Sequence, residues 1–121
     1  MSLLNSKPFM KDDSVYINQI LDSVHKISSF SKGLDRDGFF ADAKTQSAVI
    51  MQLLLIGEIS KKISEVTKTK IGLPWKDIAG FRDRAIHNYF EIDLDVVWNT
   101  ILSDMPELAQ KLKGGAQFFT Y

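Results

Sequence analysis

Three side chains within residues 81–89 have the chemistry needed to act on a phosphate. Arg82 is permanently charged, and its planar guanidinium can bind two phosphate oxygens at once. His87 ionises near neutral pH and can therefore serve as a general base or a general acid. Asp83 lies four positions before His87, so on a helix the two share a face, and the carboxylate can accept a hydrogen bond from the imidazole.

This combination suits the cleavage of RNA through its own 2′-hydroxyl. The reaction needs a base for the hydroxyl proton, an acid for the leaving oxygen and positive charge beside the phosphorane. Arg82 and His87 are five positions apart, about 140° around a helix axis, so a single helix splays them. A site where two such helices meet would bring both pairs together. On spacing alone, Arg82 could equally be solvated and His87 could cap the end of its helix.

The composition excludes several other kinds of site. The 121 residues include no cysteine and only two histidines, His25 and His87, far apart in the sequence. We therefore expect no disulfide, no metal site and no cofactor. The formal net charge of zero argues against a protein that coats nucleic acid through bulk charge, so an RNA contact must come from a local cluster. The lysines near residues 61–70 form either a solvated helix end or a surface that steers RNA.

The longest apolar stretch, residues 48–56, is too short to cross a membrane. A membrane span needs about 20 apolar residues, and Gln52 interrupts this stretch. The first residues show no basic start followed by an apolar run, so we expect a cytoplasmic protein without a membrane partner.

Residues 48–56 also predict an oligomer, because a helix that is apolar nearly all round is covered on more than one side. In so small a chain, a second subunit is the expected cover, which predicts a homodimer.

Helical periodicity dominates the chain and predicts an all-α, up-and-down bundle of four or five helices. No segment alternates with the two-residue period of a strand. The first helix is expected from about Asp13 to residues 31–33, and a long second helix from about 37 to 67. The third begins at Pro74 and runs towards Tyr89, and the fourth is capped by Asp93.

Some residues carry predictions about packing. Pro106 should kink or break the fourth helix, and residues 114–115, both glycine, should end the regular structure. Gly57 lies inside the second helix at a cost of about 1 kcal/mol relative to alanine, which a close helix crossing would explain. Trp75 and Trp98 are expected in the core, and His25 in solvent.

The order Arg-x-x-x-x-His-x-Tyr, formed by Arg82, His87 and Tyr89, resembles the signature of the HepT-like branch of the HEPN superfamily. The resemblance extends beyond the motif and covers roughly residues 13–112. It rests on several segments in the same order: residues 45–50, 55–58, 73–82 and 93–98.

The resemblance implies a single HepT-like domain over residues 1–121 that dimerises through helix faces, with the motifs of both subunits facing a shared cleft. It implies a metal-independent ribonuclease toxin in which Arg82 and His87 are catalytic and Asp83 is supporting. A nucleotidyltransferase-type antitoxin would neutralise the toxin by adenylylating Tyr89. Arg84 lies outside the signature and is a candidate RNA phosphate contact. The tail, residues 113–121, lies outside the resemblance and has no assigned role.

Two rival functions stay open at this point. The chain could be a non-catalytic module that binds a nucleotide or RNA while a partner nucleotidyltransferase does the chemistry. It could also be a structural partner that only holds such an enzyme. The intact pair of Arg82 and His87 favours the ribonuclease.

Overall fold

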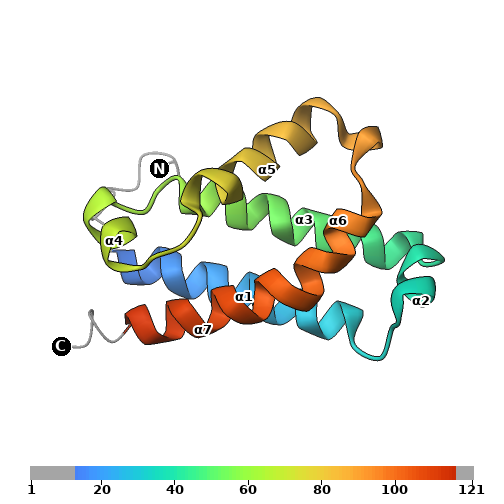
Figure 1. Cartoon of the computed structure of the whole chain (residues 1–121), viewed down its shortest axis with the longest axis horizontal. Coiled ribbons are helices and arrows are strands. Elements are labelled where there is room, and N and C mark those ends of the chain that lie inside the picture. The colour runs from blue at the N-terminus through green and yellow to red at the C-terminus, as the bar shows by residue number, and fades with distance from the viewer. Residues whose placement is uncertain (1–12, 117–121) are drawn as a thin grey trace, which may run out of the picture.

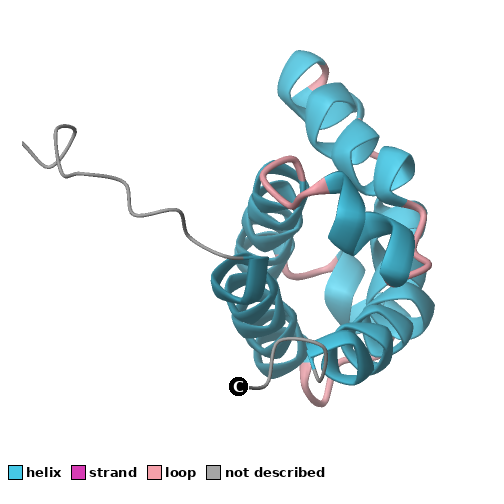
Figure 2. Cartoon of the chain, turned by 90° about the vertical axis from the view of Figure 1, so that its left-hand side faces the viewer, coloured by secondary structure: helices cyan, strands magenta, loops and turns pink. Residues whose placement is uncertain are grey.

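The chain folds into an all-α bundle, described by a computed structural model over residues 13–116 (Figure 1). This part of the chain contains helices and loops and no strand, as Figure 2 shows. The longer helices alternate in direction along the bundle, which confirms the predicted all-α, up-and-down class. The elements are α1 (Asp13–Ser31), α2 (Arg36–Phe40), α3 (Ala43–Ser60), α4 (Glu65–Lys70), α5 (Trp75–His87), the 3-10 turn η2 (Tyr89–Glu91), α6 (Leu94–Asn99), the π-helical segment η3 (Thr100–Asp104) and α7 (Met105–Ala116).

The core lies between α1, α3 and the chain that runs from α6 to α7. Apolar side chains of α1 recur every three or four residues and are buried, as the periodicity predicted. Trp98 is buried and stacks on Phe39, with 5.3 Å between ring centroids. The other buried side chains of this core include Ile17, Ile20, Val24, Ile27, Val49, Ile50, Leu53, Ile56, Val97, Ile101, Leu108 and Leu112.

The prediction of one long helix over residues 37–67 is wrong, because three helices occupy this stretch. Asp42 caps α3: its carboxylate accepts hydrogen bonds from the backbone N–H and the hydroxyl of Thr45, at 3.0 and 2.7 Å. These bonds hold the pKa of Asp42 below its usual value. Ser64 caps α4 by accepting from the backbone N–H of Thr67. Each cap satisfies orphan N–H groups and starts a new helix, which the apolar pattern does not reveal.

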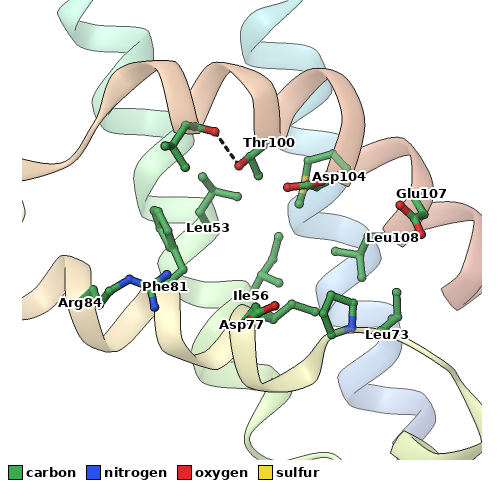
Figure 3. A pocket seen from close by; sticks show the side chains of 14 residues that line it. Leu53, Ile56, Leu73, Asp77, Phe81, Arg84, Thr100, Asp104, Glu107 and Leu108 are labelled. Carbon is green, nitrogen blue, oxygen red and sulfur yellow. Dashed lines mark hydrogen bonds between the residues drawn. The ribbon is translucent and has the colours of Figure 1, made fainter.

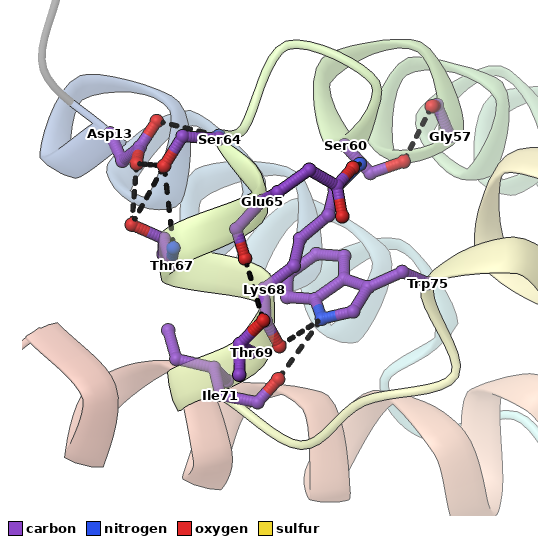
Figure 4. Close-up of polar contacts among 10 residues, drawn as sticks. All are labelled: Asp13, Gly57, Ser60, Ser64, Glu65, Thr67, Lys68, Thr69, Ile71 and Trp75. Atoms are coloured by element: carbon purple, nitrogen blue, oxygen red, sulfur yellow. Dashed lines mark hydrogen bonds and ion pairs between the residues drawn. The ribbon is translucent and has the colours of Figure 1, made fainter.

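The short helix α4 is tied to its neighbours by polar contacts (Figure 4). The carboxylate of Asp13, in the first turn of α1, accepts hydrogen bonds from Ser64 and from the hydroxyl of Thr67. On the other side, Trp75 Nε1 donates to the carbonyls of Lys68 and Ile71 at 3.2 and 3.0 Å. Trp75 therefore packs against the core only in part, and its indole N–H fixes the connection from α4 to α5.

Pro106 was predicted to kink or break the helix, and the chain stays helical through it, so the helix is not broken there. The π-helical segment η3 directly precedes the proline, and its altered hydrogen-bond register lets the helix continue past a residue that has no N–H. The glycine pair does not end the structure either, because α7 continues to Ala116 and Gly114 does not adopt the positive φ of a helix-ending glycine. Gly33 does so, with φ of 80°, and follows α1 as predicted. Residues 117–121 of the tail lie outside the described part of the chain.

Gly57 marks a close crossing of α3 and α5, which explains the glycine as expected. A Cβ atom at this position would lie 2.6 Å from Arg82 Cβ and 3.0 Å from the carbonyl oxygen of Ile78. Real Cβ atoms do not approach that closely, and the nearest atoms belong to the root of a side chain and to backbone. The crossing can therefore form only with glycine on α3. Of the helices described, none has the length and apolar character required to span a bilayer.

Gly57→Ala should lower the free energy of unfolding by about 1–3 kcal/mol, because the added methyl group forces α3 and α5 apart. The gain of about 1 kcal/mol in helix propensity offsets this only in part. Urea unfolding monitored by circular dichroism measures the change. Gly114→Ala is the matched control, since a Cβ there meets nothing within 4 Å. Equal stability of the two variants would contradict the role given to the crossing.

Candidate active site

Helix α5 carries Arg82, Asp83 and His87, and its packing on α3 sets their positions. Arg82 faces α3, with its Cβ against Gly57 and its side chain 29% exposed. His87 is exposed in the last turn of α5. One helix thus splays the two residues, as their spacing predicted, with Arg82 anchored at the crossing and His87 in solvent.

Four charged side chains form a cluster where α3 and α5 cross, which we call the Arg82 cluster: Glu58, Lys61, Arg82 and Asp83. Arg82 Nη1 donates to Asp83 Oδ1 at 3.1 Å, and Arg82 Nε lies 3.5 Å from Glu58 Oε1. Lys61 Nζ donates to the same Asp83 oxygen at 2.7 Å and lies 3.8 Å from Glu58 Oε1. Hydrogen bonds from Lys61 and then Arg82 lower the pKa of Asp83, so its carboxylate is ionised at neutral pH.

Asp83 is hydrogen-bonded through its carboxylate to Arg82 and not to His87. Its carboxylate makes its hydrogen bonds to Lys61 and Arg82, and none to His87 within residues 13–116. The spacing allowed an Asp83–His87 bond, but Lys61, which follows the end of α3, donates to this carboxylate from a charged ammonium. The side chain of His87 has no hydrogen bond or ion pair with any residue in the described part of the chain.

Arg82 and Tyr89 are seven positions apart, a spacing that predicts a shared face on a continuous helix. The two residues do not share a helical face, so this prediction is wrong. Helix α5 ends at His87, Asn88 leaves the helical conformation with φ of −137° and ψ of 57°, and Tyr89 begins the turn η2. Tyr89 is 43% exposed, and its ring packs edge-on against that of Phe90, a residue that is 98% exposed. The turn places Tyr89 two residues beyond His87, at a position exposed to solvent.

Arg84 lies away from the Arg82 cluster, beside a hollow on another side of α5 (Figure 3). The hollow has a volume of about 340 Å³ and a mostly apolar lining that includes Leu53, Ile56 and Phe81. Its polar lining includes Asp77, Asp104, Glu107 and Thr100, and no histidine. Negative charges at its edge disfavour RNA. The hollow was not predicted, because its walls come from α3, α5, η3 and α7, which are distant in sequence.

Glu58 and Lys61 are the members of the cluster that sequence reasoning missed. Glu58 lay within a segment that supported the resemblance, and Lys61 was interpreted as part of a solvated or steering group of lysines. Their contacts with α5 join residues more than twenty positions apart, so local spacing does not reveal them. Residues 13–116 contain no group of three or more His, Cys, Asp or Glu side chains that could hold a metal ion.

Comparison with known proteins supports the family. The family model described as "Ribonuclease HepT-like" matches residues 20–114. A "Probable ribonuclease HepT" from Thermococcus cleftensis is 36% identical over 99 residues, which cover 81% of this chain and 90% of the relative. A "Putative RNase" from Caldanaerobacter subterraneus subsp. tengcongensis is 34% identical over 105 residues, covering 86% of this chain and 94% of the relative.

A third relative is longer than this chain. The "Gamma-glutamylcyclotransferase and putative RNase" of Methanocaldococcus jannaschii is 35% identical over 103 residues, which cover 84% of this chain but only 46% of the relative. The chain thus spans about half of that protein. No solved structure matches significantly. The family match over most of the chain and the relatives' agreement confirm the resemblance inferred from the motif: the chain belongs to the HepT-like ribonuclease family.

Proposed function

We propose that this protein is a metal-independent endoribonuclease toxin whose catalytic groups are Arg82 and His87. The observation that carries the proposal is the pair itself: an arginine anchored at a helix crossing and an exposed histidine on the same helix. The family supplies the substrate class, RNA. The supporting residue is Asp83, which acts through its contact with Arg82.

The proposed reaction uses the RNA's own 2′-hydroxyl as nucleophile. His87 takes the hydroxyl proton, the oxygen attacks the adjacent phosphorus, and the bond to the 5′-oxygen of the next nucleotide breaks. The protonated His87 then gives that proton to the leaving oxygen, and the product carries a 2′,3′-cyclic phosphate. Arg82 stabilises the negative charge that develops on the phosphorane. Because Arg82 and His87 point away from each other on one helix, the reaction fits a cleft shared by two copies of α5.

A second copy of this chain is the proposed partner that completes the cleft. Met51 and Leu55, on α3, are 54% and 41% exposed although they belong to the most apolar stretch of the sequence. Ile86 is exposed on α5 between Arg82 and His87. Single exposed apolar side chains are ordinary, but this set lies on the two helices that carry the site and suits burial against an identical surface.

The proposed control of the toxin is adenylylation of Tyr89 by a nucleotidyltransferase-type antitoxin. The tyrosine oxygen would attack the α-phosphate of ATP, form a phosphodiester with AMP and release pyrophosphate. Tyr89 is exposed in η2 and adjacent to the end of α5, which supports this role. The added nucleotide brings bulk and negative charge close to His87, and both oppose the entry of RNA.

Arg82→Ala and His87→Ala should each reduce RNA cleavage by at least about 100-fold, since each removes a group that acts in the transition state. Cleavage by the unaltered protein should continue in EDTA. Incubation of a labelled RNA with purified protein measures both. His25→Ala and Arg36→Ala are matched controls, because both residues are exposed and lie outside residues 81–89.

Three results would contradict this assignment. Inhibition by EDTA that a divalent ion reverses would show a metal mechanism. Cleavage at the unaltered rate by either alanine variant would remove that residue from the catalytic pair. RNA binding without cleavage would identify the chain as a non-catalytic binding module.

Leu55→Asp should convert a homodimer into a monomer at micromolar concentration, because a carboxylate cannot be buried unpaired in an apolar interface. Cleavage should fall with the dimer. Sedimentation equilibrium gives the mass of each variant. Leu102→Asp is the control, an equally drastic change at an exposed leucine of η3. A monomeric unaltered protein would show that the second subunit is absent.

Tyr89→Phe should still cleave RNA but should gain no AMP when incubated with the partner nucleotidyltransferase, ATP and magnesium, because it lacks the attacking oxygen. Intact mass spectrometry detects the modification, and the variant should escape neutralisation. Tyr16→Phe, at a half-buried position of α1, should be modified and neutralised like the unaltered protein. Full neutralisation of Tyr89→Phe would indicate control by complex formation alone.

A further inference from the structure

Glu58, from the end of α3, contacts the guanidinium of Arg82 and belongs to no part of the motif. We infer that Glu58 is a positioning residue: it holds the guanidinium of Arg82 in the orientation in which it meets the phosphate. The inference rests on the proposed function, because it assigns Glu58 a role in the same site. In this role Glu58 sets the direction of the Arg82 guanidinium and does not itself touch RNA.

The side chain of Arg82 is held at three points. Its root lies against Gly57, which leaves no room for another atom on that side. Nε lies 3.5 Å from Glu58 Oε1, and Nη1 donates to Asp83 Oδ1 at 3.1 Å. Nη2 makes no hydrogen bond within residues 13–116. A guanidinium is planar, so fixing two of its nitrogens fixes the direction of the third, and Nη2 becomes the donor aimed at a phosphate oxygen.

Lys61 keeps both carboxylates in place while they hold Arg82. Its ammonium lies 2.7 Å from Asp83 Oδ1 and 3.8 Å from Glu58 Oε1, so it bridges the two acids. The Arg82 cluster therefore contains two positive and two negative groups. Without Lys61, two carboxylates beside the arginine would leave a net negative charge where RNA must bind. The lysine restores neutrality and lets the acids orient Arg82 without repelling the substrate.

Glu58 could alternatively be a bystander that only lowers the local potential, and the two roles predict opposite effects on catalysis. Removing a negative charge near a phosphate site should tighten the binding of RNA whatever Glu58 does. If Glu58 also aims Arg82, the same change must slow the chemical step, because a misplaced group loses much of its effect in the transition state. A bystander would leave the chemical step unchanged.

Stability is not the main role of these contacts. The side chains of Glu58, Lys61 and Asp83 are 47%, 37% and 52% exposed, and ion pairs at such exposure contribute little to folding. Glu58→Gln keeps the size of the side chain and should change the melting temperature by less than about 4 °C. Loss of activity in this variant can then be read as loss of positioning.

The experiment measures single-substrate kinetics of RNA cleavage by Glu58→Gln. We expect kcat to fall about 10- to 100-fold while KM for RNA falls about two- to fivefold at low salt. Glu65→Gln removes the same charge from α4, where Glu65 pairs with Lys68 and not with the cluster, and should leave kcat unchanged. Glu58→Asp retains the carboxylate on a shorter side chain, so its kcat should lie between that of Glu58→Gln and that of the unaltered protein.

A second measurement does not depend on cleavage. The Nε–H proton of Arg82, observed by NMR, should exchange with water faster in Glu58→Gln than in the unaltered protein, and Glu65→Gln should not change it. An unchanged kcat in Glu58→Gln would overturn the inference and leave the ribonuclease proposal standing. So would an equal exchange rate of the Arg82 Nε–H proton in Glu58→Gln and in the unaltered protein. If the unaltered protein cut no RNA, the proposed function would fail, while the Arg82 proton would still decide whether Glu58 holds the guanidinium.

Discussion

The close crossing of α3 and α5 at Gly57 is the constraint on which the candidate site depends. Because position 57 has no side chain, α5 approaches until Arg82 Cβ occupies the space that a methyl group would need. That approach brings the next residue, Glu58, beside the guanidinium. Lys61, one turn further along, then reaches Asp83. Four charged groups on two helices thus meet because one residue lacks a Cβ atom, and a wider crossing would move Arg82 away from the acid of α3.

Much of the fold could be predicted from local patterns, and the errors occur where local hydrogen bonds override periodicity. The period of α1, the start of α5 after Pro74 and the cap of α6 at Asp93 were read correctly because each depends on neighbours in sequence. The long helix over residues 37–67 was predicted wrongly, because caps at Asp42 and Ser64 start new helices within this stretch. An apolar period continues across such a restart without interruption, so it cannot reveal the break.

The candidate site likewise has features that the sequence predicted and features that it did not. The motif could be read from the sequence, and one helix carries Arg82, Asp83 and His87 as predicted. The hydrogen-bond partners of Asp83 could not be predicted, because Lys61, from another helix, donates to its carboxylate and His87 does not. The position of Tyr89 was predicted wrongly because helical spacing was extended two residues beyond the end of α5. Tertiary contacts thus decide how the motif residues are paired.

The contact between Asp13 and α4 has a consequence for the cooperativity of folding. Its hydrogen bonds join residues more than fifty positions apart and so close a loop that contains α1, α2 and α3. Closing a long loop costs entropy that is recovered only when the enclosed helices pack. Helix α4 has six residues, too few to be stable alone. It should therefore open together with the first turn of α1 as one unit of partial unfolding, while the paired α1 and α3 remain folded.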